Sequence, residues 1–214
     1  MTEQDASPDG TLVPHWIVVL GRALALALAA IVITFSADHS PAFGLAVFGS
    51  LAIVTGALLV AGARVAFARG AERGIHSLIG VVSLIAGIAA LAISAGLPFL
   101  TLVVGSWALV TGVLELTLGF LRRGHSFSRD WIFAGALTIL LGLVAFLLPS
   151  ELREAYVGPD EVERYLTTPV ILVGIIGAYF AILAVYLGIA GFSLKWATTE
   201  PTPATVAESD QQTS

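Results

Sequence analysis

The sequence contains no cysteine among its 214 residues. It can therefore form no disulfide, use no thiolate nucleophile and build no cysteine-ligated metal site. Charged residues are also scarce, because Asp, Glu, Lys and Arg make up only 12% of the chain, against about 25% in a typical soluble domain. The few basic residues are dispersed along the chain, so the sequence lacks the basic patch of a nucleic-acid-binding protein.

Long apolar runs dominate the sequence. Hydrophobic residues make up 57% of the chain, and the runs match the roughly 20 residues that a membrane-spanning helix requires. They lack the strict alternation of a membrane β-barrel, and helices satisfy their own backbone groups in lipid. The sequence therefore predicts an all-α fold, a polytopic membrane bundle of six transmembrane helices in contact with the lipid bilayer. The expected helices cover 16–36, 41–63, 74–94, 98–121, 131–148 and 169–194.

The two ends of the chain differ from the apolar middle. Residues 1–15 hold acidic but no basic residues, which is the wrong charge for a signal peptide, so we expect the first helix to be retained. Residues 196–214 are acidic and rich in Pro, Thr and Ser, which is typical of a disordered tail. The predicted organisation is a short N-terminal segment at 1–15, a membrane domain at 16–195 and a tail at 196–214.

The basic residues predict an orientation. The connections at 64–73 and 122–130 carry three arginines each, and Lys195 follows the last run. The connections at 37–40 and 95–98 carry none, and the long 149–168 loop holds two arginines among five acids. Because Lys and Arg accumulate in cytoplasmic loops, we expect both termini in the cytoplasm and the 149–168 loop outside.

Two octets in the chain are nearly identical. "GSLAIVTG" at 49–56 resembles "GSWALVTG" at 105–112, and "GVVSLIAG" at 80–87 resembles "GALTILLG" at 135–142. The repetition predicts three parallel helical-hairpin repeats. Parallel repeats differ from the inverted repeats of many secondary transporters. The predicted hairpins cover 16–63, 74–121 and 131–194.

Glycines recur within these octets at helical spacing. Small residues on one face let two helices approach closely in lipid, so the pattern predicts a packing stripe. The predicted packing glycines are Gly49, Gly56, Gly80, Gly87, Gly105, Gly112, Gly119, Gly135 and Gly142.

Two opposite charges lie inside apolar runs. Arg22 stands six residues after Trp16, and Glu115 stands six residues before Leu121. Both therefore lie about 10 Å from the same end of the bundle, at about 1.5 Å of rise per residue. We hypothesise an ion pair between them, which His76 at the same end would join. The alternatives are that Arg22 snorkels to the headgroups, or that the charges handle a proton or a solute.

The 149–168 loop is the largest segment expected outside the membrane. Its apolar residues recur at helical spacing on either side of Gly158–Pro159, which predicts two short interfacial helices. Its carboxylates would take up protons in an acid medium, although a solvated acidic loop is the commoner explanation. With His76, these acids are the candidate pH-responsive residues: Glu151, Glu154, Asp160, Glu161 and Glu163.

Known chemical motifs are absent from the sequence. His15, His39 and His125 have no metal-ligand spacing, and no phosphate-binding loop, calcium loop or nucleophile motif occurs. We therefore expect no metal, no cofactor and no catalytic residue, and hence no enzyme.

Three segments of the chain form a longer pattern: "GVVSLIAGIAALAISAGLP" at 80–98, "GSWALVTGVLELTLGFLRR" at 105–123 and "FAGALTILLGLVAFLLP" at 133–149. In this pattern the chain resembles the HdeD-type acid-resistance membrane protein family. The resemblance covers roughly 16–195, and the 149–168 loop is longer than the family pattern. The resemblance implies the bacterial inner membrane and a role in acid stress, and it brings no established catalytic residues.

Three functions remain open from the sequence. The first is a non-enzymatic inner-membrane protein linked to acid or envelope stress resistance. The second is a small proton-coupled transporter or channel that uses Arg22 and Glu115. The third is an assembly subunit of a larger membrane complex. The expected protein partners are further copies of the chain or other membrane proteins.

Overall fold

The computed structural model describes residues 15–66, 70–93, 95–123, 128–157 and 163–197. Within these residues, six helices are long and apolar enough to cross a membrane, which confirms the predicted six-helix membrane bundle. Most of the predicted N-terminal segment and C-terminal tail lies outside the described residues. The elements are α1 (His15–Phe35), α2 (Pro41–Ala66), α3 (Ala71–Ala92), α4 (Gly96–Leu121), α5 (Ser128–Leu147), β1 (Arg153–Val157), β2 (Glu163–Thr167) and α6 (Thr168–Ala197).

The start of α2 shows why the helices begin where they do. The Ser40 hydroxyl accepts a hydrogen bond from the Phe43 N–H at 3.2 Å and so caps the helix. Pro41 follows at the first helical position, where its missing N–H has no intrahelical partner to lose. The Ser40 N–H in turn donates to Asp38 Oδ1 at 2.8 Å, and this bond lowers the pKa of the Asp38 carboxyl.

The long loop forms a β-hairpin, so the prediction of two short interfacial helices there was wrong. β1 and β2 pair antiparallel, with Arg153 opposite Thr167 and Val157 opposite Glu163. Tyr, Val and Thr are common in β-strands. The residues at helical spacing form segments too short to be stable as isolated helices, so pairing between the two strands prevails. The Arg153 guanidinium lies 4.1 Å from the centre of the Tyr165 ring on the neighbouring strand. Gly158–Pro159 lies outside the described residues.

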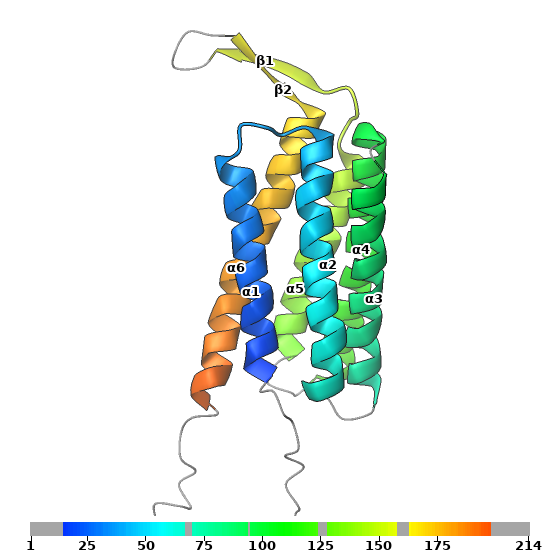
Figure 1. The fold of residues 1–214 in the computed structure, drawn as a ribbon, viewed down its shortest axis with the longest axis vertical. Coiled ribbons are helices and arrows are strands. Elements are labelled where there is room, and N and C mark those ends of the chain that lie inside the picture. Colours follow the sequence, from blue (N-terminus) through cyan, green and yellow to red (C-terminus); the bar gives the residue numbers. More distant parts are fainter. Residues whose placement is uncertain (1–14, 67–69, 94, 124–127, 158–162, 198–214) are drawn as a thin grey trace, which may run out of the picture.

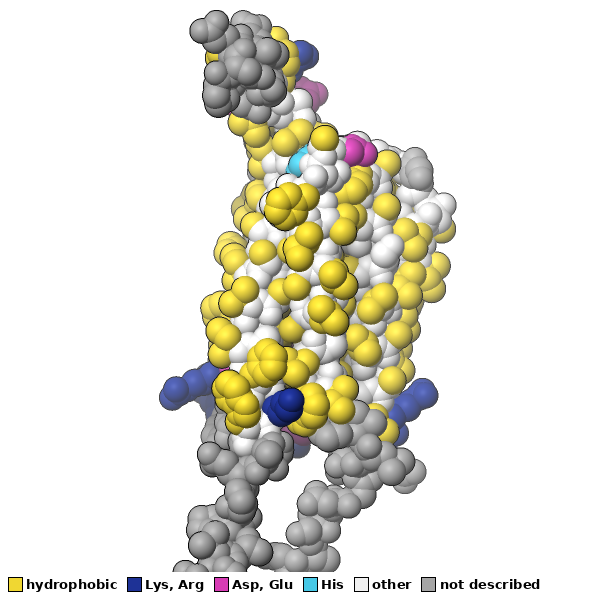
Figure 2. Space-filling model, turned by 60° about the vertical axis from the view of Figure 1, so that its left-hand side comes forward, with side chains coloured by type: hydrophobic (Ala, Val, Ile, Leu, Met, Phe, Trp, Pro, Cys, Tyr) yellow, Lys and Arg dark blue, Asp and Glu magenta, His cyan; other side chains and the backbone are white. Residues whose placement is uncertain are grey.

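The bundle has two chemically different ends (Figure 1). We call the end with the β-hairpin the hairpin end; it also holds the α1–α2 and α3–α4 connections. We call the other the basic end, because α2 and α6 finish there with Arg64 and Lys195 in their last turns. Lys and Arg side chains gather at the basic end and also occur at the hairpin, and the surface between the ends is largely hydrophobic (Figure 2). This surface is what a lipid bilayer would cover.

The three-hairpin repeat is not confirmed, because the helices pair differently. The most extensive packing joins α2 to α3, α4 to α5 and α1 to α6. Two of these pairs are joined by the arginine-bearing connections, and the third brings together the first and last helices. The predicted hairpins α1–α2, α3–α4 and α5–α6 pack less extensively.

The repeated glycines account for this pairing. A Cβ added to Gly56 on α2 would lie 2.7 Å from the Gly80 carbonyl oxygen on α3. A Cβ added to Gly135 on α5 would lie 2.8 Å from the Gly112 carbonyl oxygen on α4. In both pairs a glycine of one octet therefore faces a glycine of the other, and the two backbones touch. The duplicated pattern is thus a contact surface between α2 and α3, used again between α4 and α5.

The hairpin half of the interior is filled by apolar side chains. Leu100, Val104, Leu172, Ile176 and Phe180 have no solvent-exposed surface. They come from the first turns of α4 and from α6. This apolar part of the core therefore lies between the hairpin end and the polar residues nearer the basic end.

Candidate functional site

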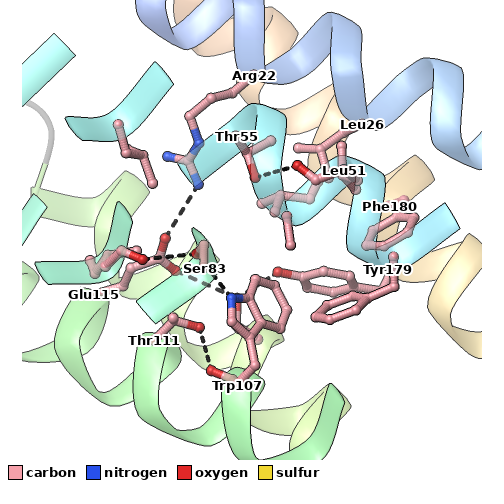
Figure 3. Close-up of a pocket in the computed structure, with 16 residues that line it drawn as sticks. Arg22, Leu26, Leu51, Thr55, Ser83, Trp107, Thr111, Glu115, Tyr179 and Phe180 are labelled. Carbon is pink, nitrogen blue, oxygen red and sulfur yellow. Dashed lines mark hydrogen bonds and ion pairs between the residues drawn. The ribbon is translucent and has the colours of Figure 1, made fainter. Parts of the chain in front are cut away.

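A polar cluster occupies the interior of the bundle, where α1, α4, α5 and α6 meet (Figure 3). Glu115 is buried, with 8% of its surface exposed. Its Oε1 atom lies 3.6 Å from Nη2 of Arg22. The structure therefore brings together the two charges that the sequence placed at equal depth.

Thr138 and Tyr179 extend the cluster beyond the ion pair. The Thr138 hydroxyl lies 3.5 Å from Glu115 Oε2 and 2.8 Å from the Tyr179 hydroxyl. It also donates to the Ala134 carbonyl at 2.7 Å. A hydroxyl has one proton and two acceptor lone pairs, so while Thr138 donates to Ala134 it accepts from Tyr179. Polar groups of four helices are thus in contact across the bundle.

The Arg22 guanidinium has spare hydrogen-bonding capacity. Its Nε is buried and has no hydrogen-bond partner among the described residues. Its contact with Glu115, at 3.6 Å, is longer than the about 2.7–3.2 Å of a good N–H···O bond. A guanidinium carries five N–H donors. Glu115 therefore balances the charge of Arg22 but does not satisfy all of its N–H donors.

Two adjoining cavities contact this pair. The inner cavity is lined by Arg22 and Glu115 together with Trp107, Thr138 and Tyr179. Its space open to the centre of a water molecule is about 30 Å³, and one water needs about 10–15 Å³ by this measure. The inner cavity is therefore large enough for water and too small for a bulky solute.

The outer cavity lies on the side of the basic end. Arg22 and Glu115 line it as well, with His76, Asp130 and Trp131. Its space open to a water centre is about 60 Å³. Because both cavities share the ion pair, the outer cavity connects the pair with the basic end of the bundle.

His76 is buried and lines the outer cavity with Arg22 and Glu115. That it joins the ion pair stays a prediction. Its Nδ1 lies 2.9 Å from the backbone oxygen of Glu72, and its ring meets the Trp131 ring edge-on with 5.7 Å between centres. Asp130, on the same cavity wall, accepts a hydrogen bond from the Tyr186 hydroxyl at 2.7 Å.

The acids predicted to respond to pH lie elsewhere. Glu151 and Glu154 are exposed at the hairpin end, and Glu163 begins β2. Asp160 and Glu161 lie outside the described residues, as does His125. His15 begins α1 and His39 lies between α1 and α2. No group of three or more metal-ligating side chains occurs in the part of the chain that the structure describes.

The Ser and Thr positions of the repeated octets were visible in the sequence, but the predicted site residues did not include them. The two GS-x4-TG octets carry a threonine just before their last glycine, and the other two octets carry a Ser or Thr three residues after their first glycine. All four of these hydroxyl residues line the inner cavity: Thr55, Ser83, Thr111 and Thr138. Ser83 also accepts a hydrogen bond from Trp107 Nε1 at 3.0 Å. The repeat therefore builds the polar wall of the cavity as well as the glycine contacts.

The fold and the cluster together define a multi-pass membrane protein with a charged site inside a helical bundle. Residues 78–147 match the family model described as a short repeat of unknown function (DUF308). This segment runs from α3 through α5 and includes Glu115 and Thr138, but not Arg22 or Tyr179. No curated protein and no solved structure matches the chain.

Proposed function

We propose that the chain is a non-enzymatic protein of the bacterial inner membrane, of the HdeD type, that contributes to resistance against acid or envelope stress. The observation that carries this proposal is the buried contact between Arg22 and Glu115, 3.6 Å apart beside two cavities. The short-repeat match over residues 78–147 and the sequence resemblance to the HdeD-type family support it.

The ion pair offers a physical route from acidity to a structural response. A carboxylate that gains a proton loses its attraction for the guanidinium, and an uncompensated charge in a low-dielectric interior is costly. Protonation of Glu115 would therefore loosen the contact between α1 and α4. These two helices are otherwise held through the more extensive α1–α6 and α4–α5 contacts.

The same proposal includes an orientation of the bundle in the membrane, which rests on where the Lys and Arg residues lie. Lys and Arg are enriched in cytoplasmic loops, so the basic end, both termini and the outer cavity would face the cytoplasm. The β-hairpin would then lie outside the cell. In this orientation Glu115 would respond to acidification of the cytoplasm, while Glu151 and Glu154 would meet the external medium.

A second function, a small proton-coupled transporter or channel, is favoured by one observation. Arg22 and Glu115 line both cavities, so the two cavities lead from the basic end into the bundle past both charges. The path meets the fully buried Leu100 and Phe180 toward the hairpin end, so transport would need those helices to part. Proton or solute flux in proteoliposomes, abolished by Glu115→Gln, would establish this function.

Survival of acid-challenged cells tests the leading proposal. In a strain that lacks its own copy, the wild-type chain is expected to restore survival and Glu115→Gln to restore less than a tenth of it, because the variant has no carboxylate to titrate. Glu151→Gln, exposed at the hairpin end, is the matched control and should behave as wild type. Equal survival with and without the gene under both acid and envelope stress would refute the proposal.

A further inference from the structure

We propose that the two cavities beside Arg22 form a binding site for a small monovalent anion, which enters together with a proton on Glu115. The chemical class is that of chloride or formate: a single negative charge and at most a few atoms. The site concerns the same ion pair as the proposed function, but it stands on the geometry of Arg22 and does not depend on a role in acid resistance.

The first argument is the incomplete neutralisation of Arg22. Its Nε–H is buried without a partner among the described residues, and its one carboxylate contact is long at 3.6 Å. A guanidinium presents its donors as a planar fork that suits an anion. Arg22 lines both cavities, so its unused donors border the space that an anion would fill.

The second argument is charge balance. With Glu115 ionised, the pair is neutral and an added anion would face the carboxylate. With Glu115 protonated, the guanidinium, whose side chain is 19% exposed, has no counter-charge, which is expensive in a membrane interior. One proton and one anion entering together leave the net charge of the site unchanged. Proton uptake and anion binding therefore favour each other, and by linkage each raises the affinity for the other.

The surroundings of Glu115 leave Arg22 as the anion's partner. The titratable or charged residues that line the two cavities are Arg22 on α1, His76 on α3, Asp130 on α5 and Tyr179 on α6. α2 contributes none. Asp130 opposes an anion, but it accepts the Tyr186 hydroxyl at 2.7 Å, which disperses part of its charge. His76 in the outer cavity would add a second positive charge when it is protonated.

The size of the cavities selects the ligand. The space open to a water centre is about 30 Å³ in the inner cavity and about 60 Å³ in the outer one. This admits an ion comparable to one or a few waters. A large organic anion such as gluconate does not fit.

Calorimetric titration of the purified full chain in neutral detergent tests the site, with chloride and formate as probes and gluconate as the background anion. Wild-type affinity for chloride and formate should rise by up to tenfold for each unit of pH lost, as expected when one proton accompanies each anion. Glu115→Gln, which mimics the protonated acid, should bind at neutral pH at least tenfold more tightly than wild type and lose the pH dependence that Glu115 confers, keeping only what His76 adds. Arg22→Gln should not bind at either pH.

Glu72→Gln is the matched control, since Glu72 pairs with Arg122 and lines neither cavity; its binding should follow wild type. Where a variant fails to fold, the pH titration of the wild type can still overturn the inference. Binding that is absent at all pH values, or independent of pH, would overturn the inference. The same titration is repeated in nanodiscs containing phosphatidylglycerol. Binding that appears only in these nanodiscs would also overturn the inference, because it would assign Arg22 to a lipid headgroup. None of these results depends on whether the gene protects cells from acid.

Discussion

Replacing Gly56 by alanine is expected to destabilise the bundle by about 1–3 kcal/mol, the usual cost of forcing extra atoms into a packed interior. The added Cβ would lie 2.7 Å from the Gly80 carbonyl oxygen and 3.0 Å from the Leu84 backbone nitrogen. Backbone atoms of a neighbouring helix move only with the helix, so α2 and α3 must separate. The expected result is a lower midpoint of thermal or denaturant unfolding in detergent.

Gly174→Ala is the matched control. Gly174 also lies inside a membrane-spanning helix, but a Cβ there would meet nothing within 4 Å. Alanine is the better helix former by about 1 kcal/mol, so this variant should be as stable as the wild type or more stable. Gly112→Ala, on α4 against α5, should repeat the loss seen for Gly56. If Gly56→Ala proved as stable as Gly174→Ala, the close helix contacts described above would be wrong.

Removing one member of the buried ion pair is expected to have the largest effect on stability. Arg22→Gln or Glu115→Gln alone should cost about 3–5 kcal/mol, because each leaves the other charge buried and uncompensated. The double variant has no charge to compensate, so it should cost clearly less than the sum of the two single changes. Unfolding of the four proteins under one condition gives the coupling energy directly.

The pair at the basic end provides the comparison for this cycle. Arg122 Nε and Glu72 Oε1 lie 2.6 Å apart, but 40% of the Arg122 side chain is exposed. Water and salt screen such a pair, so its coupling should be about 0–1 kcal/mol. Purely additive effects of Arg22→Gln and Glu115→Gln, or a coupling no larger than that of Arg122 and Glu72, would show that the buried charges do not act as a pair.

Local sequence patterns predicted the helices closely, because the bilayer leaves few alternatives. A run of apolar residues near 20 in length has to be helical in lipid, and the prolines and polar residues between the runs mark the ends. The 41–63 prediction begins at the same residue as α2, and the 98–121 prediction ends at the same residue as α4. The equal depth of Arg22 and Glu115 followed from the same geometry.

Helix pairing did not follow from the repeat. The octets showed which faces are small, but two equivalent glycine faces can pair in several ways, and chain order suggested helix pairs joined at the hairpin end. The structure pairs Gly56 with Gly80 and Gly112 with Gly135, in helices joined at the basic end. Pairing depends on contacts among all the helices at once, which a single segment does not encode.

The remaining misses have separate physical causes. The β-hairpin was missed because a few residues at helical spacing also suit short strands, and only pairing between β1 and β2 decides the outcome. Tyr179 was missed because one tyrosine in an apolar run has the pattern of a packing residue. Its role appears only when α6 places its hydroxyl 2.8 Å from Thr138 on α5.

The most direct test of the proposed architecture is the labelling of single cysteines with a membrane-impermeant maleimide. The natural sequence has no cysteine, so each introduced thiol is unique. Gly70→Cys and Arg123→Cys mark the exposed basic end, and Ala95→Cys and Glu151→Cys mark the exposed hairpin end. In intact spheroplasts the two hairpin-end sites should react, and the two basic-end sites should react only after lysis. Labelling of Gly70→Cys or Arg123→Cys in intact spheroplasts would contradict the six-span topology or its orientation.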